Sequence, residues 1–214
     1  MNVLRRVLNR GLLAAACALS LGLPLQPALA ADASSPDGLI RQLSLETLES
    51  VKTDKAIQGG DLQKIISLVD GKVMPHVNFQ RMTSSAVGRF WRQATPEQQQ
   101  RLQDEFKTLL VRTYAGALTQ VKDQTIALRP LRASPSDAEV VVKTEIRGKG
   151  DPIQLDYRLE KSGAVWKIYD VNVLGIWLAD QYRNSFSQEI GANGIDGLIK
   201  VLTERNQKAA GGKA

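Results

Sequence analysis

Hydrophobic residues recur at helical spacing in the first part of the chain and at strand spacing after Gln124. From Phe79 to Trp91 they fall at offsets of 0, 3, 7, 8, 11 and 12 residues, which places them on one face of a helix. Asn78 stands at the capping position of this segment. Thr95-Pro96-Glu97-Gln98 is a capping box with proline in the first turn. The pattern predicts helices from Pro36, Asp61, Phe79 and Pro96.

Polar and apolar residues alternate in four segments separated by turn-forming residues, namely 125–131, 140–147, 153–160 and 165–173. Such alternation predicts an antiparallel meander of four strands with one face toward water. Helical spacing returns in Ile176–Ile190 and Ile195–Arg205. Because strands and helices do not alternate, we expect an α+β fold rather than a parallel sheet. It would have a helical N-terminal half, a curved four-stranded antiparallel meander and C-terminal helices.

The first thirty residues have the layout of a secretory signal peptide. Met1–Arg10 holds arginines and no acid, Gly11–Leu23 is almost unbroken apolar sequence, and Ala28-Leu29-Ala30 supplies a cleavage site. The apolar run is shorter than the ~20 residues that span a bilayer. We expect cleavage after Ala30 and a periplasmic chain, with an uncleaved anchor or acylation of Cys17 as alternatives. Residues 31–206 would form a single domain and residues 207–214 a flexible tail.

Composition argues against many catalytic chemistries. Cys17 would leave with the signal peptide, and His76 is the single histidine. Removing the three N-terminal arginines lowers the net charge from +6 to +3, so much of the basicity serves targeting rather than nucleic-acid binding. The sequence contains neither a glycine-rich phosphate loop nor a G-x-S-x-G motif. We therefore expect no catalytic residue, no metal site and no cofactor.

The predicted helices and strands carry a generous supply of apolar side chains on their inward faces. A packed core and a ligand cavity use the same residue types, so the pattern leaves both interpretations open. Candidates for lining a cavity are the residues that lie on apolar faces at the right period. They are Met82, Val87, Trp91, Phe106, Leu110 and Tyr114 from the helices, and Val142, Ile146, Leu155, Tyr157, Trp166 and Val171 from the sheet.

Several short segments carry a resemblance to a known family. They are Val77–Met82, Val87–Arg92, Ala94–Gln98, Phe106–Tyr114, Trp166–Val171, Tyr182–Phe186 and Gly194–Ile199. In this order they resemble the MlaC family, the periplasmic phospholipid-binding proteins of toluene-tolerance and lipid-asymmetry transport systems. The resemblance covers most of residues 36–206. It implies that these residues form one lipid-binding domain, in which helices and sheet enclose an apolar lipid cavity.

The resemblance also implies a function and partners. The protein would be a shuttle that carries phospholipid between an outer-membrane lipoprotein–porin complex and an inner-membrane ABC transporter with its substrate-binding subunit. Such transport maintains the lipid asymmetry of the outer membrane. A carrier of this kind needs a dry cavity and no catalytic residues, and it would be an auxiliary component of the transporter rather than an enzyme.

One corner departs from the family pattern. Where the family usually has Glu-Gly-Val-Ser, this chain has Leu174-Gly175-Ile176-Trp177. A tryptophan can bury about 200 Å2. We expect Trp177 to belong to the lipid-binding residues, either closing the cavity mouth or presenting an aromatic anchor to a partner.

Two other function classes stay open. A small enzyme of NTF2-like fold, an isomerase or dehydratase, could use Asp170 with His76 or with Tyr157 as an acid–base pair. An envelope chaperone or adaptor would bind no small ligand, and it would have a solid core in place of a cavity.

Overall fold

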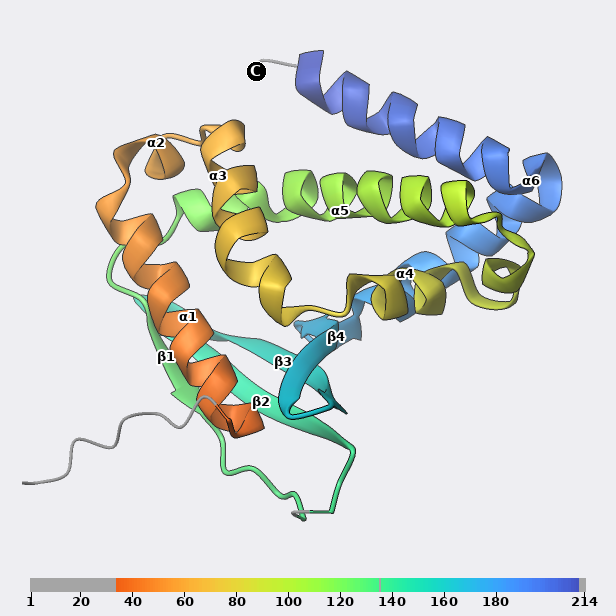
Figure 1. Cartoon of the computed structure of the whole chain (residues 1–214). Coiled ribbons are helices and arrows are strands. Elements are labelled where there is room, and N and C mark those ends of the chain that lie inside the picture. The colour runs from red at the N-terminus through yellow and green to blue at the C-terminus, as the bar shows by residue number, and fades with distance from the viewer. Residues whose placement is uncertain (1–33, 135, 212–214) are drawn as a thin grey trace, which may run out of the picture. The chain divides into compact units, whose positions relative to one another are not determined.

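The computed structural model describes residues 34–134 and 136–211, and Figure 1 shows their arrangement. The predicted signal peptide, its cleavage site and Cys17 lie outside the described residues. Within the described part, none of the helices combines the length and the apolar character needed to cross a membrane.

The helices begin where the sequence places capping residues. Asn78 accepts a hydrogen bond from the backbone N–H of Arg81, and the Thr95 capping box is complete, so both predicted caps are confirmed. The bounds are α1 Pro36–Thr53, α2 Lys55–Gln58, α3 Leu62–Leu68, the π-helical turn η1 Val69–Val73, the 3-10 turn η2 Met74–His76, α4 Phe79–Val87, the 3-10 turn η3 Gly88–Gln93, α5 Pro96–Thr119 and α6 Leu178–Gly211.

The sheet confirms the α+β class but has five strands rather than the four that we predicted. They are β1 Thr125–Leu128, β2 Glu139–Gly148, β3 Gly150–Ser162, β4 Val165–Val173 and β5 Ile176–Trp177. They lie in the order β1-β2-β3-β4-β5, and each pairs antiparallel with its neighbours. Leu174 and Gly175 both have positive φ, so the chain turns back after β4 and pairs once more before α6 begins. The predicted helix start at Ile176 is therefore wrong by two residues.

Two helix boundaries also differ from the predictions. Gly88, at φ 66° and ψ −136°, ends α4, and Phe90 and Trp91 follow in a 3-10 turn rather than on the same helix. At Gly194 the backbone of α6 leaves helical geometry, as the predicted break requires, and the helix then continues to Gly211. The flexible tail predicted from residue 207 is thus helical as far as residue 211. Asn206 fixes this end by donating to the Glu105 carboxylate (2.7 Å) and backbone oxygen (3.0 Å).

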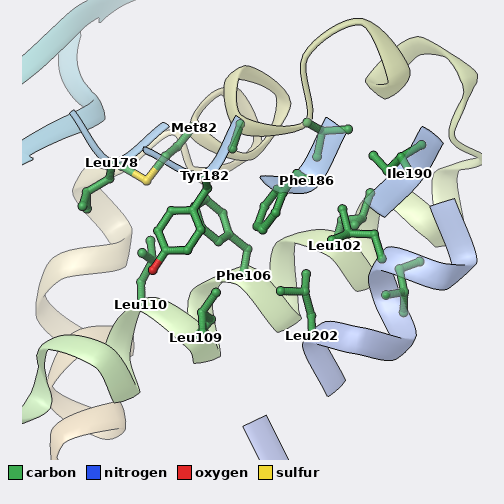
Figure 2. Packing of buried hydrophobic residues seen from close by; sticks show 14 residues of the cluster. Met82, Leu102, Phe106, Leu109, Leu110, Leu178, Tyr182, Phe186, Ile190 and Leu202 are labelled. Carbon is green, nitrogen blue, oxygen red and sulfur yellow. The ribbon is translucent and has the colours of Figure 1, made fainter. Parts of the chain in front are cut away.

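The largest hydrophobic cluster joins α4, α5 and α6. Figure 2 shows Phe106 of α5 beside Tyr182 and Phe186 in this cluster. The ring centroid of Phe106 lies 5.1 Å from that of Tyr182 and 5.3 Å from that of Phe186. Both ring pairs meet edge to face, which is the favoured aromatic geometry. A smaller cluster is made of Val51, Ile57, Ile65 and Leu68 from α1, α2 and α3. It packs against the end of α5.

Helix α1 covers one face of the sheet, which we call the inner face. Leu39, Ile40 and Leu43 of α1 pack there against a second cluster, made of Val140, Val142, Leu159 and Ile168. At the other end of α1, the Lys52 ammonium donates to the Gln124 carbonyl (2.9 Å) beside β1. The inner face is thus covered by α1 along β1 and β2, while β4 meets the cluster of α4, α5 and α6 through Val171 and Val173.

Candidate functional site

The inner face consists of parallel rows of side chains that run across the strands. Strand register fixes each row, because directly paired residues point to the same face. The rows, from one end of the sheet to the other, are Val140–Leu159–Ile168, Val142–Tyr157–Val171, Thr144–Leu155–Val173–Ile176 and Ile146–Ile153.

Accessibility increases from row to row across the inner face. The first row is buried throughout. In the second row Val142 is buried, whereas Tyr157 and Val171 are partly accessible. In the last two rows Thr144 is buried, Leu155, Val173 and Ile146 are partly accessible, and Ile153 and Ile176 are 45% and 56% exposed. One end of the inner face is therefore packed core, and the other is an apolar surface that the helices leave partly open.

Tyr157 lies at the boundary between these halves. Burial raises the pKa of its phenol to about 12, although hydrogen bonds with the hydroxyls of Ser44 and Thr144 oppose the rise. The Thr144 hydroxyl in turn donates to the backbone carbonyl of Leu155. The polar groups at this boundary are satisfied by one another, which leaves an apolar surface beyond them.

The predicted lining residues fall into three sets. Helical residues Met82, Val87, Phe106 and Leu110 are buried in the cluster of α4, α5 and α6, with Trp91 and Tyr114 partly buried against it. Val142 is buried beneath α1, with Tyr157, Trp166 and Val171 packed beside it. Ile146 and Leu155 belong to the open rows. The structure thus brings Ile146, Leu155, Tyr157 and Val171 together on one surface, and that group remains our prediction for lipid contact.

Trp177 lies apart from this group, on the outer face of the sheet. It pairs with Asn172, whose side chain faces away from the inner rows, and the guanidinium carbon of Arg158 lies 3.9 Å from the centroid of its ring. The geometry is that of a cation–π contact. This position favours the expectation that Trp177 meets a partner over the expectation that it closes the cavity mouth.

Asp170 is a buried carboxylate held from three sides on the same outer face. It accepts from Arg158 (3.0 Å) and from the backbone N–H groups of Val171 (2.9 Å) and Ala179 (3.2 Å). Burial raises its pKa, while these bonds act in the opposite direction. Asp170 and Tyr157 therefore lie on opposite faces of the sheet, so they do not form the acid–base pair that the sequence left open. Among the described residues, no cluster of three or more His, Cys, Asp and Glu side chains could hold a metal ion.

Two surface hollows flank the sheet. The larger, about 630 Å3, lies over the outer face and is lined mainly by charged side chains, among them Arg129, Lys143 and Arg158. The smaller, about 260 Å3, lies where α1 meets Trp166 and His76. It is below the roughly 300–1,000 Å3 typical of ligand pockets. His76 thus lines the hollow beside α1, and Asp170 is not among the residues that line it.

The sequence pattern missed the exposed residues that continue the open rows. Ile153 lies on the predicted apolar face of its strand but is not among the predicted lining residues, and Ile176 belongs to a predicted helix. The signal that could have found them is the apolar departure at Leu174–Trp177, because large apolar residues are uncommon at a turn that water surrounds.

Comparison with known proteins decides the family of this chain. The family model described as "MlaC protein" matches residues 41–204.

The chain belongs to the MlaC family.

Members and solved structures agree with this assignment along most of the chain. A Pseudomonas putida protein named toluene tolerance protein ttg2D is 28% identical over 210 residues, covering 95% of this chain and 94% of its own length. The intermembrane phospholipid transport system binding protein MlaC of Haemophilus influenzae is 23% identical over 175 residues, covering 80% of this chain and 82% of its own. The resemblance inferred from short motifs is thereby confirmed.

A solved structure supplies a relative with its ligand. The phospholipid-binding protein from Ralstonia solanacearum, in complex with a phospholipid, is 47% identical to this chain and superposes with a TM-score of 0.79. The match covers 81% of this chain and 98% of that one.

Proposed function

We propose that this chain binds a phospholipid and carries it across the periplasm as the soluble component of an ABC-type lipid transport system. The observation that carries the proposal is the open half of the inner face, where Ile146, Leu155 and Val173 form an apolar surface that the helices leave partly accessible. The phospholipid complex of the relative from Ralstonia solanacearum supports the choice of ligand.

The physical need for such a carrier is large. Each methylene moved out of water contributes about 0.8 kcal/mol, so two acyl chains with roughly 30 methylenes resist crossing water by about 25 kcal/mol gross. A partly open apolar surface between a sheet and helices removes that barrier without any covalent step. The need to bind acyl chains accounts for a proposed site whose residues are apolar, with no ionisable side chains converging among them.

Membership in the MlaC family supports a proposal for the partners and the compartment. The system would connect an outer-membrane lipoprotein–porin complex with an inner-membrane ABC transporter and its substrate-binding subunit, and so would maintain outer-membrane lipid asymmetry. The basic and apolar N-terminal segment supports export to the periplasm, with the mature chain beginning at Ala31. N-terminal sequencing of protein from the envelope fraction tests export, and a chain that begins at Met1 would contradict it.

Mass spectrometry of lipids extracted from the purified mature chain tests the ligand. We expect phospholipid in near-stoichiometric amount when the protein is expressed with its own N-terminal segment. Val141→Asp serves as a control variant that should keep its phospholipid. Val141 is 40% exposed on the outer face of the same strand as Val142, so the charge does not reach the inner face. Wild-type protein without phospholipid would contradict the proposal and would favour an adaptor that has no small ligand.

A further inference from the structure

The turn between β4 and β5 presents an unusual residue to solvent. Leu174 has a φ of 52° and Gly175 a φ of 91°, and the two link Val173 to its partner Ile176. Two consecutive positive φ values define the tight hairpin turns that favour Asn-Gly or Asp-Gly. A leucine at the first position is disfavoured by the backbone, and its side chain is 66% exposed.

Leu174 is held firmly in this position. Its backbone N–H donates to the carbonyl of Gln154 on β3 (3.1 Å), and the N–H of Gly175 donates to the Asn172 side chain (2.8 Å). The turn is therefore tied to the sheet on both sides. The fold gains nothing from a large apolar side chain at its tip, since asparagine would fit the backbone better.

The tip continues the open rows of the inner face. Ile176 pairs with Val173 and Val173 with Leu155, so their side chains adjoin on one face. Ile153 lies next along β3, one residue beyond the Gln154 carbonyl that binds Leu174. Ile153, Leu174 and Ile176, which we call the apolar corner, thus connect the partly accessible interior to solvent. They are among the most exposed large hydrophobic residues of the described chain.

We propose that the acyl chains of the phospholipid enter and leave the inner face across the apolar corner. This inference rests on the proposed function and names the route by which the ligand reaches its site. An acyl chain that slides over Ile153, Leu174 and Ile176 keeps contact with apolar surface until it reaches Leu155 and Tyr157. Less of the acyl chain therefore faces water midway through transfer. The exposed leucine at a strained turn then serves transfer rather than folding.

The test compares the lipid content of the protein with the rate of lipid transfer. The purified mature protein, beginning at Ala31, is loaded with fluorescent phosphatidylethanolamine. The rate at which this lipid moves into acceptor vesicles of phosphatidylethanolamine and phosphatidylglycerol is measured. Leu174→Asn should leave the fold and the bound lipid unchanged, because asparagine suits the turn. It should slow transfer about tenfold, because the barrier rises by roughly the contact of one apolar side chain. Adding Ile176→Thr, which keeps strand propensity, should slow transfer further.

Two variants elsewhere are the controls. Leu45 lies on α1 and Val165 pairs with Ser162 at the far end of β4, and each is 52% exposed. Leu45→Gln and Val165→Thr should transfer at the wild-type rate. Normal lipid content with unchanged transfer in Leu174→Asn, or equal slowing in the controls, would overturn the route. Absence of lipid from the wild-type protein would instead contradict the proposed function itself.

Discussion

The guanidinium of Arg158 lies over the indole ring of Trp177 at 3.9 Å from the ring centroid, and it also donates to the buried Asp170 at 3.0 Å. The stack and the ion pair join β3, β4 and β5 on the outer face, at the point where α6 begins. The backbone N–H of Ala179 in the first turn of α6 donates to the same carboxylate. Trp177 therefore belongs to the set of outer-face contacts that fixes the start of α6.

Replacement of Trp177 should affect stability modestly and lipid content not at all. Trp177→Ser removes a cation–π contact worth about 1 kcal/mol together with some buried area, whereas the inner face is untouched. We expect a folded variant whose free energy of unfolding in urea falls by about 1–2 kcal/mol. Arg158→Gln, which removes the cation but keeps a side-chain donor for Asp170, with and without Trp177→Ser completes a double-mutant cycle. Loss of bound phospholipid from the folded serine variant would show that Trp177 does contact the ligand.

A charge on the inner face should have opposite effects in its two halves. Leu155→Asp places a carboxylate on the open rows, where water can still reach it in the empty protein, so the chain should fold but hold no phospholipid. Val142→Asp buries the same carboxylate beneath α1 and should prevent folding. Circular dichroism together with lipid mass spectrometry separates the outcomes. A folded Leu155→Asp variant with full lipid content would remove Leu155 from the lining.

The raised pKa of Tyr157 predicts a loss of stability at high pH. The phenol ionises near pH 10 in the unfolded chain but at about 12 in the folded one, so the stability present below pH 10 is lost as the pH rises toward 12. The expected decrease is about 2–3 kcal/mol in the free energy of unfolding. Tyr157→Phe should show a shallower decline over the same interval. Identical slopes for the two proteins would mean that Tyr157 is not buried in solution.

Arg81 should matter for the packed end of the sheet. It donates to Glu139 (2.7 Å) and to Glu160, and its guanidinium carbon lies 3.6 Å from the centroid of the Tyr169 ring. These contacts tie α4 to β2, β3 and β4. Arg81→Ala should lower the free energy of unfolding by about 2 kcal/mol, whereas Arg92→Ala at an exposed position of η3 should change it by less than about 0.5 kcal/mol.

The same contacts of Arg81 predict that the free energy of unfolding depends on pH in the acid range. Hydrogen bonds from Arg81 and Tyr169 lower the pKa of Glu139, so its stabilising effect is present above its unfolded pKa and is lost as the pH falls through the folded value. Stability measured from pH 7 downward should therefore decline more steeply in the wild type than in Arg81→Ala. Parallel curves would indicate that the ion pairs of Arg81 do not form in solution.

Local chemistry made much of the fold predictable. Asn78 and Thr95 marked helix starts because their side chains satisfy free backbone N–H groups, and the structure places both caps as expected. The short strand β5 escaped prediction because Leu174-Gly175 lacks the Asn or Asp that signals a two-residue hairpin. The early end of α4 arises from the conformation of Gly88, which the apolar period does not reveal.

The candidate site was harder to predict for a different reason. Alternation along a strand shows which residues share a face but not which helix covers them. Val142 and Ile146 are equivalent in the pattern, yet α1 buries the first and leaves the second partly accessible. Only the position of α1 across the strands separates core from open surface, and that position depends on contacts between residues about a hundred positions apart.

The pairing of hydroxyl groups around Tyr157 has a consequence for cargo selection. Because Tyr157 bonds with Ser44 and Thr144, and Thr144 bonds with the Leu155 carbonyl, these groups do not need a partner from the ligand. The apolar surface beside Tyr157 then contacts acyl chains through dispersion forces alone. It offers no hydrogen bond that would select a particular chain length or degree of unsaturation. A surface of this kind would accept acyl chains that differ in length and in saturation.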